Sequence, residues 1–177
     1  LQHLKEGDQI IVSRKATGTL VIDNLTDGRN LYLIGTGTGL APFMSIVRDP
    51  ATYEKFGQIV LVHGVRVADE LAYHDLLVER LPAHEFLGDM VASQLLYYPT
   101  VTREPWPNQD RITTCIEKGT LFADLEVPPL DPAVDRVMVC GSMDMINDIK
   151  ALVEKAGLKE GSNAHPAEFV IEKAFVG

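Results

Sequence analysis

Short apolar runs alternate with amphipathic stretches from residue 30 onward. Five of the runs have the length of buried strands, and four of the stretches between them place apolar residues at helical spacing. The five predicted strands are 31–34, 58–63, 95–101, 136–140 and 168–176. Buried strands that alternate with helices favour a parallel sheet with helices on both faces. The pattern therefore predicts an α/β fold around a five-stranded parallel sheet.

The predicted helices carry recognisable end signals. One begins after a glycine-rich segment, with Leu40, Phe43 and Val47 at helical spacing. Asp69 is placed to cap a second helix, and Ser142 is placed to cap a fourth. The second, third and fourth predicted helices are 70–80, 111–117 and 143–156, the last ending at Gly157.

The first 29 residues have a different pattern. Residues 9–13 and 18–22 are β-branched runs, and Asp27 and Gly28 predict a turn. Two strands alone are marginal in water and need a sheet to join. We therefore interpret 1–29 as the closing strands of an antiparallel β domain and 30–177 as the α/β domain. The chain starts without Met and ends on an apolar run, so we expect both ends to be cut.

Composition excludes several classes of function. A formal charge of −9 argues against a nucleic-acid partner, because such domains carry basic surfaces. No apolar run approaches the roughly 18 residues that cross a bilayer, so no membrane insertion is expected. The cysteines, Cys115 and Cys140, lie far apart without metal-ligand spacing, which argues against a metal site and predicts a cytoplasmic protein.

The segment from Gly35 to Pro42 follows a buried strand and opens a helix. Free N–H groups at a helix start suit a pyrophosphate, and glycines allow close approach of phosphate oxygens to the backbone. The glycines have the spacing G-x-G-x-G, which differs from the dinucleotide fingerprint G-x-G-x-x-G, so a tight turn without a ligand stays open. The residues with predicted cofactor contacts here are Gly35, Thr36, Gly37, Thr38, Gly39 and Pro42.

Residues 31–45 resemble the NADP-binding loop of the ferredoxin–NADP⁺ reductase family, and are most similar to the bacterial enzymes that also accept flavodoxin. The resemblance continues along the chain in the family's order. It includes VHGVR at 62–66, VTRE at 101–104, DRI at 110–112, CGSM at 140–143 and AFVG at 174–177. The resemblance implies that the α/β sheet is a nucleotide-binding domain and that 1–29 end a β-barrel FAD domain.

The basic residues at the strand ends favour NADP(H) over NAD(H). An NAD site usually has an acid near the end of the second strand, whereas this strand ends at Arg66. By resemblance, Thr102, Arg103 and Arg111 would hold the 2′-phosphate, with Arg66 near the phosphates. Exposed arginines are also often only solvated, and that alternative stays open.

The resemblance also implies a corner for hydride transfer. Cys140 would lie beside the nicotinamide in a positioning role, although a lone cysteine at a strand end can equally be a small buried apolar residue. Glu172 is a candidate catalytic carboxylate or, alternatively, a charge at a strand edge. The remaining predicted cofactor contacts are Gly141, Ser142, Met143, Ala174 and Phe175, with alanine at 174 as in the bacterial subgroup.

The resemblance implies hydride exchange between NADPH and FAD, followed by single-electron exchange with ferredoxin or flavodoxin. The family's Arg-x-Tyr-Ser flavin motif is not found in this sequence, so this chain by itself is expected to be inactive and the complete protein monomeric. Two alternatives stay open. One is another NAD(P)H-dependent flavin reductase or oxygenase reductase component, and the other is a non-catalytic nucleotide-binding module.

Overall fold

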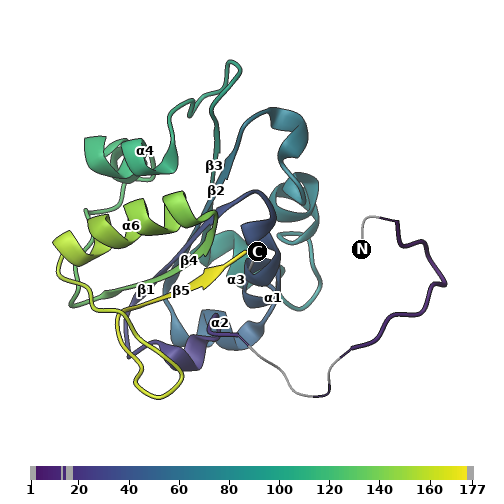
Figure 1. The fold of residues 1–177 in the computed structure, drawn as a ribbon, viewed down its shortest axis with the longest axis horizontal. Coiled ribbons are helices and arrows are strands. Elements are labelled where there is room, and N and C mark those ends of the chain that lie inside the picture. The colour runs from purple at the N-terminus through teal and green to yellow at the C-terminus, as the bar shows by residue number, and fades with distance from the viewer. Residues whose placement is uncertain (1–2, 13, 15–17, 175–177) are drawn as a thin grey trace.

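Five parallel strands form the centre of the domain. The computed structural model describes residues 3–12, 14 and 18–174, and its strands are ordered β3-β2-β1-β4-β5 across the sheet (Figure 1). All four neighbouring pairs are parallel, which confirms the predicted sheet. The strands are β1 Asn30–Thr36, β2 Gln58–Val65, β3 Leu95–Val101, β4 Asp135–Gly141 and β5 Phe169–Lys173.

Helices cover both faces of this sheet. Successive residues of β1 alternate between two cores, with Leu31 and Leu33 in one and Tyr32 and Ile34 in the other. A strand that is buried on both faces needs a nearly continuous apolar sequence, which is the pattern seen in β1, β2 and β4. The first face carries α1 Ala41–Ile46, α2 Pro50–Lys55 and α3 Gly88–Gln94, and the second carries α4 Ile112–Lys118, α5 Thr120–Asp124 and α6 Met143–Lys155 (Figure 1).

The strand order places a topological switch between β1 and β4. The chain leaves β1 toward one face and leaves β4 toward the other, so the connections diverge at the carboxyl ends of these two strands. Ligands of open α/β sheets bind in the crevice that such a divergence creates. The start of α6 supports the predicted cap, because the Ser142 side chain accepts a hydrogen bond from the Met145 N–H (3.4 Å).

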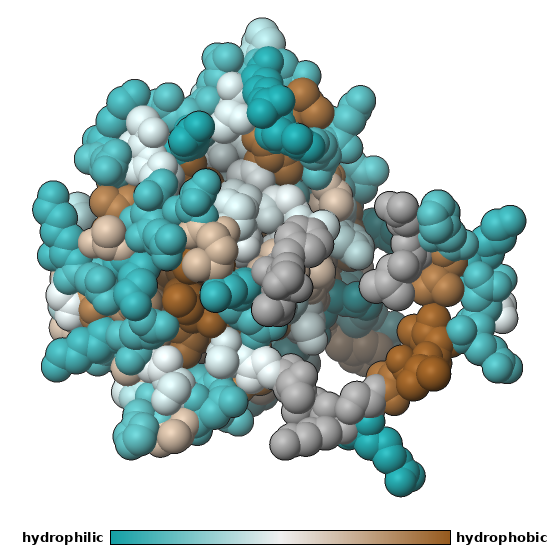
Figure 2. All heavy atoms as spheres, in the orientation of Figure 1, coloured by the Kyte–Doolittle hydropathy of each residue, from teal (hydrophilic) through white to brown (hydrophobic). Residues whose placement is uncertain are grey.

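The two strands predicted near the N-terminus are not formed in the described part of the chain. Residues 9–12 have no regular structure, and residues 18–24 form bends and the 3₁₀ helix η1 Ile22–Asn24. Residue 13 lies outside the described residues. A strand needs a partner for its backbone groups, and within the described residues none pairs with 9–12. The apolar side chains of residues 10–12 are exposed instead, and Ile11 is fully exposed (Figure 2).

The predicted helix over 70–80 is also wrong as a continuous element. The chain forms the 3₁₀ helix η3 Ala68–Glu70 and then, after a break, the π-helical turn η4 Leu76–Arg80. Tyr73 lies in the break with a φ of 63°, a left-handed conformation that a right-handed helix cannot include. Asp69 lies inside η3 and caps nothing. The short helices α2, α3 and α5 were not predicted, and η2 Gly37–Leu40 precedes α1.

A buried histidine in β2 makes the fold sensitive to acid. His63 is fully buried, and its Nδ1 lies 3.1 Å from the Tyr97 hydroxyl. Burial, with a smaller contribution from nearby His74, lowers the pKa of His63 to about 4. The unfolded chain therefore takes up a proton at this imidazole at higher pH than the folded chain does.

We predict that stability decreases as the pH falls from about 6.5 toward 4, by on the order of 3 kcal/mol from His63 alone. The measurement is urea unfolding at pH 7, 5.5 and 4 for the unmodified chain and for His63→Gln, which has no imidazole to protonate. The gap in unfolding free energy between the two should change with pH by this amount. His165→Gln, at an exposed site, should follow the unmodified chain, and parallel curves for His63→Gln would contradict the prediction.

Candidate functional site

A large cleft opens at the carboxyl ends of the strands. Its volume is about 1520 Å³, and its walls come from the loop after β1, the ends of β2 and β3, and the starts of α4 and α6. Nine residues with predicted cofactor contacts line it: Thr36, Gly37, Thr38, Arg66, Thr102, Arg103, Arg111, Ser142 and Ala174. These residues are up to 138 positions apart (174 − 36), and the parallel sheet brings them together because its strands end at one edge.

The glycine loop fits closely against the neighbouring strand. A side chain at Gly39 would overlap the backbone carbonyl of Cys140 in β4, so only glycine permits this approach. Gly37 has a φ of 52° and lies in the left-handed region that favours glycine. Thr36 and Thr38 line the cleft from the same loop. Gly35 is buried beneath it, where a side chain would crowd the Phe43 ring.

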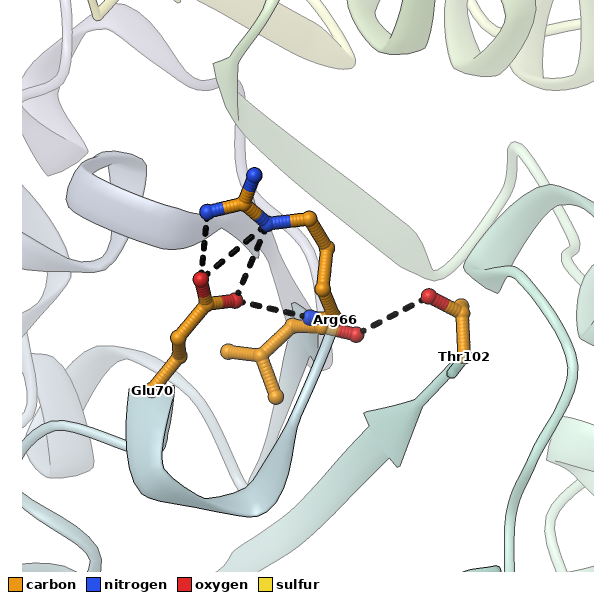
Figure 3. Close-up of polar contacts among 4 residues, drawn as sticks. Arg66, Glu70 and Thr102 are labelled. Atoms are coloured by element: carbon orange, nitrogen blue, oxygen red, sulfur yellow. Dashed lines mark hydrogen bonds and ion pairs between the residues drawn. The ribbon is translucent and has the colours of Figure 1, made fainter. Parts of the chain in front are cut away.

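The basic wall of the cleft is an extension of the β2–β3 pairing. The Thr102 N–H donates to the Val65 carbonyl (3.1 Å), and the Arg103 N–H donates to the Arg66 carbonyl (2.8 Å). The Thr102 hydroxyl also donates to the Val65 carbonyl (3.3 Å; Figure 3). These bonds fix Arg66 and Arg103 side by side beyond the strand ends. Arg111 joins them as the residue that precedes the first turn of α4.

An acidic residue that was not predicted lies on this wall. The Glu70 carboxylate accepts hydrogen bonds from Arg66 Nε and Nη2 and from the Arg66 backbone N–H (3.0 Å; Figure 3). These hydrogen bonds hold the pKa of Glu70 down at about 2, so it is ionised at neutral pH. Arg66, the basic residue that the sequence indicated at the end of β2, is therefore paired with the acidic residue Glu70. The four-residue spacing was visible in the sequence, but these residues belong to no common helix.

The corner formed by β4 and β5 is tightly packed. Cys140 is buried, lies opposite Glu172 in the register of the two strands and does not line the cleft. Burial, with a smaller effect from Glu172, raises the pKa of the Cys140 thiol to about 11, so it stays protonated at neutral pH. Gly141 has no room for a side chain between Thr36 and Met145.

The last predicted contacts divide between the cleft and its surroundings. Ala174 lines the cleft, and its N–H donates to the Gly141 carbonyl (3.2 Å). Ser142 is exposed in the cleft, whereas Met143 is exposed at the start of α6 outside the lining. Phe175 lies outside the described residues.

Glu172 has specific partners in the segment that precedes β1. Its carboxylate accepts hydrogen bonds from the Thr19 N–H (2.7 Å) and the Thr19 hydroxyl (3.3 Å). It borders a separate hollow of about 390 Å³, which it shares with Pro42 and Asn24. Glu172 is therefore a half-buried, fixed carboxylate, which is different from a solvated charge at a strand edge.

Residues 3–12, 14 and 18–174 contain no group of three or more His, Cys, Asp or Glu side chains that could hold a metal ion. Among the same residues, no helix has the length and apolar character to cross a membrane.

Comparison with known proteins supports a nucleotide-binding site. Residues 33–151 match the family described as "Oxidoreductase NAD-binding domain". A ferredoxin–NADP reductase of Pseudomonas aeruginosa is 51% identical over 177 residues, which cover 99% of this chain and 69% of that protein. A flavodoxin/ferredoxin–NADP reductase of Rhodobacter capsulatus is 48% identical over 177 residues, which cover 100% of this chain and 66% of that protein.

A solved structure has the same fold over nearly the whole chain. The ferredoxin NADP⁺ reductase of Neisseria gonorrhoeae, with bound FAD and NADP, superposes with a TM-score of 0.83 at 28% identity. The match covers 98% of this chain and 67% of that one. The chain therefore spans about two thirds of the length of these relatives.

The contact between Gly39 and β4 leads to a prediction. Gly39→Ala should destabilise the domain by about 1–3 kcal/mol, because a Cβ would collide with backbone that cannot move cheaply. It should also weaken nucleotide binding by displacing the loop. Urea unfolding and nucleotide titration measure the two effects. Gly57→Ala is the matched control, since a Cβ there makes only ordinary contacts, and equal behaviour of the two variants would refute the packing argument.

Proposed function

Because the chain belongs to the ferredoxin–NADP reductase family, we propose that its α/β domain binds NADP(H) across the carboxyl ends of the strands and serves an FAD-dependent reductase. The observation that carries the proposal is the basic wall of the cleft, where Thr102, Arg103 and Arg111 line the same cleft beyond the ends of β2 and β3. A dianionic 2′-phosphate is the group that such a set would recognise, because guanidinium groups hold phosphate oxygens in pairs.

The cleft has the chemistry and the space for a dinucleotide. The glycine loop offers backbone N–H groups at a position where Gly37 and Gly39 permit close approach. Thr36 and Thr38 add hydroxyl donors on the same wall, and Arg66 adds a positive charge near the phosphates. At the other end, Ser142 and the small side chain of Ala174 line the cleft, and we place a flat ring there, beside the end of β4. The cleft thus has a phosphate side and a ring side.

FAD supplies the exchange between a hydride, moved as an electron pair, and single electrons. We propose that the contacts to FAD come chiefly from the portion of family members that residues 1–177 do not cover. In this chain, Cys140 would support the end of β4 behind the ring side of the cleft as a buried, neutral thiol. Glu172, fixed by Thr19, would hold its carboxylate in the separate hollow, whereas Ala174 lines the large cleft itself. Phe175 is the other candidate contact.

The proposed electron partner is ferredoxin or flavodoxin, and the proposed location is the cytoplasm. Family members named for both partners are among the relatives of this chain. Because such partners are acidic and this chain has a formal charge of −9, docking requires a local basic surface. Lys5 and Arg14 in the segment before the α/β domain are candidates for part of that surface. We propose that the complete protein acts as a monomer.

The phosphate assignment predicts a preference that can be titrated. The chain should bind 2′,5′-ADP more tightly than 5′-AMP at low salt, as measured by calorimetry. Arg103→Ala or Arg111→Ala should each weaken binding of 2′,5′-ADP by roughly tenfold or more, through loss of a charged hydrogen bond. Arg48→Ala, which removes an exposed arginine outside the cleft, should leave both affinities unchanged.

Equal affinity of a folded chain for 2′,5′-ADP and 5′-AMP would refute the 2′-phosphate assignment. Loss of binding in Arg48→Ala as well would show that overall charge, rather than the cleft, controls affinity.

The position of Glu172 predicts a separate effect on turnover. In the complete reductase, Glu172→Gln should lower kcat for NADPH-dependent reduction of ferredoxin or flavodoxin by about 10²-fold, if the carboxylate assists proton movement. Affinity for 2′,5′-ADP should stay unchanged, because Glu172 lies outside the large cleft. Glu117→Gln, on the exposed side of α4, is the control. Unchanged kcat in Glu172→Gln would reduce this residue to a structural role.

A further inference from the structure

The guanidinium of Arg66 already holds an anion supplied by the chain itself. Its Nε donates to Glu70 Oε1 at 3.0 Å and lies 3.3 Å from Oε2, and its Nη2 donates to Oε1 (Figure 3). Nε and Nη2 together form the edge through which an arginine binds a carboxylate or phosphate in bidentate fashion. Glu70 therefore occupies one of the edges through which Arg66 could hold a nucleotide phosphate.

The backbone keeps this carboxylate in place independently of the guanidinium. The Arg66 N–H donates to Glu70 Oε2 (3.0 Å), and the 3₁₀ turn of η3 folds Glu70 back over the end of β2. The start of that turn is held from the loop after β3, because the Ala68 N–H donates to Glu104 Oε1 (2.5 Å). Glu70 is thus held beside the cleft by the backbone as well as by the guanidinium.

We propose that Glu70 is a specificity-determining residue that limits nucleotide affinity by competing with phosphate for Arg66. The inference rests on the proposed function and adds a second role to the basic wall of the cleft. The binding free energy that a ligand gains from Arg66 is only the difference between a guanidinium–phosphate pair and a guanidinium–carboxylate pair. It is smaller than the full free energy of a new ion pair. A dianionic phosphate makes this exchange more favourably than a singly charged anion, because its attraction to the guanidinium is stronger. The exchange favours phosphorylated ligands and promotes their release.

The same region supplies a control for simple charge effects. Asp69 precedes Glu70, lines the same cleft and is exposed, and Arg66 makes its described side-chain hydrogen bonds to Glu70. Asp69→Asn and Glu70→Gln each remove one negative charge from the same wall of the cleft. Only Glu70→Gln removes the carboxylate that holds Arg66.

The experiment is calorimetric titration of the full chain with 2′,5′-ADP, and separately with inorganic pyrophosphate, at low salt. Glu70→Gln should tighten binding by about two- to fivefold, the range that an exposed ion pair commands. Asp69→Asn should have a smaller effect. In the Arg66→Ala background, adding Glu70→Gln should give no more than the Asp69→Asn effect. Thermal unfolding by circular dichroism checks that each variant is folded.

Two results would overturn the proposal. Equal effects of Glu70→Gln and Asp69→Asn would assign the change to net charge, and weaker binding in Glu70→Gln would make Glu70 an orienting partner of Arg66. Pyrophosphate separates this inference from the proposed function, because it carries no 2′-phosphate. A chain without preference for 2′,5′-ADP over 5′-AMP that still binds pyrophosphate more tightly in Glu70→Gln would refute the function and retain the competition.

Discussion

The contact between the glycine loop and β4 is the constraint on which the site depends. Gly39 lies against the Cys140 carbonyl with no room for a side chain, and Gly141 is equally confined between Thr36 and Met145. These two contacts bring the loop after β1 and the end of β4 together at the point where the chain diverges to opposite faces of the sheet. The depth of the cleft and the direction of the loop both follow from this backbone packing.

Charge in the cleft is arranged by strand pairing more than by individual side chains. Backbone hydrogen bonds beyond the ends of β2 and β3 fix Arg66 beside Arg103, although both side chains are exposed. Exposed arginines are flexible, so a fixed backbone is what keeps their charges in one region. Within that region, the chain places a carboxylate of its own on Arg66. The proposed exchange of partners on Arg66 would suit a cofactor that must leave after each turnover.

The sequence predicted most of the sheet and much of the cleft for a definite physical reason. Strands buried on both faces require continuous apolar runs, so β1, β2 and β4 could be located closely. Side chains that follow parallel strands must share one edge. The strand prediction was wrong over residues 9–12, because β-branched composition reports a local preference, whereas a strand needs a partner. The prediction of a continuous helix over 70–80 was wrong because the left-handed backbone of Tyr73 has no signal in the apolar periodicity. The pairing of Glu70 was missed because it depends on that same irregular turn.

The hydrogen bond between Thr19 and Glu172 joins residues that are 153 positions apart, and this separation has a consequence for biosynthesis. As the chain leaves the ribosome, Thr19 emerges early and must wait for β5, the last strand of the sheet to be made. The central strands can pair and bury their cores before that time, because their contacts need only the residues already synthesised. The corner that holds Glu172 is consequently completed last. A nascent domain therefore has its basic wall in place before the Glu172 carboxylate.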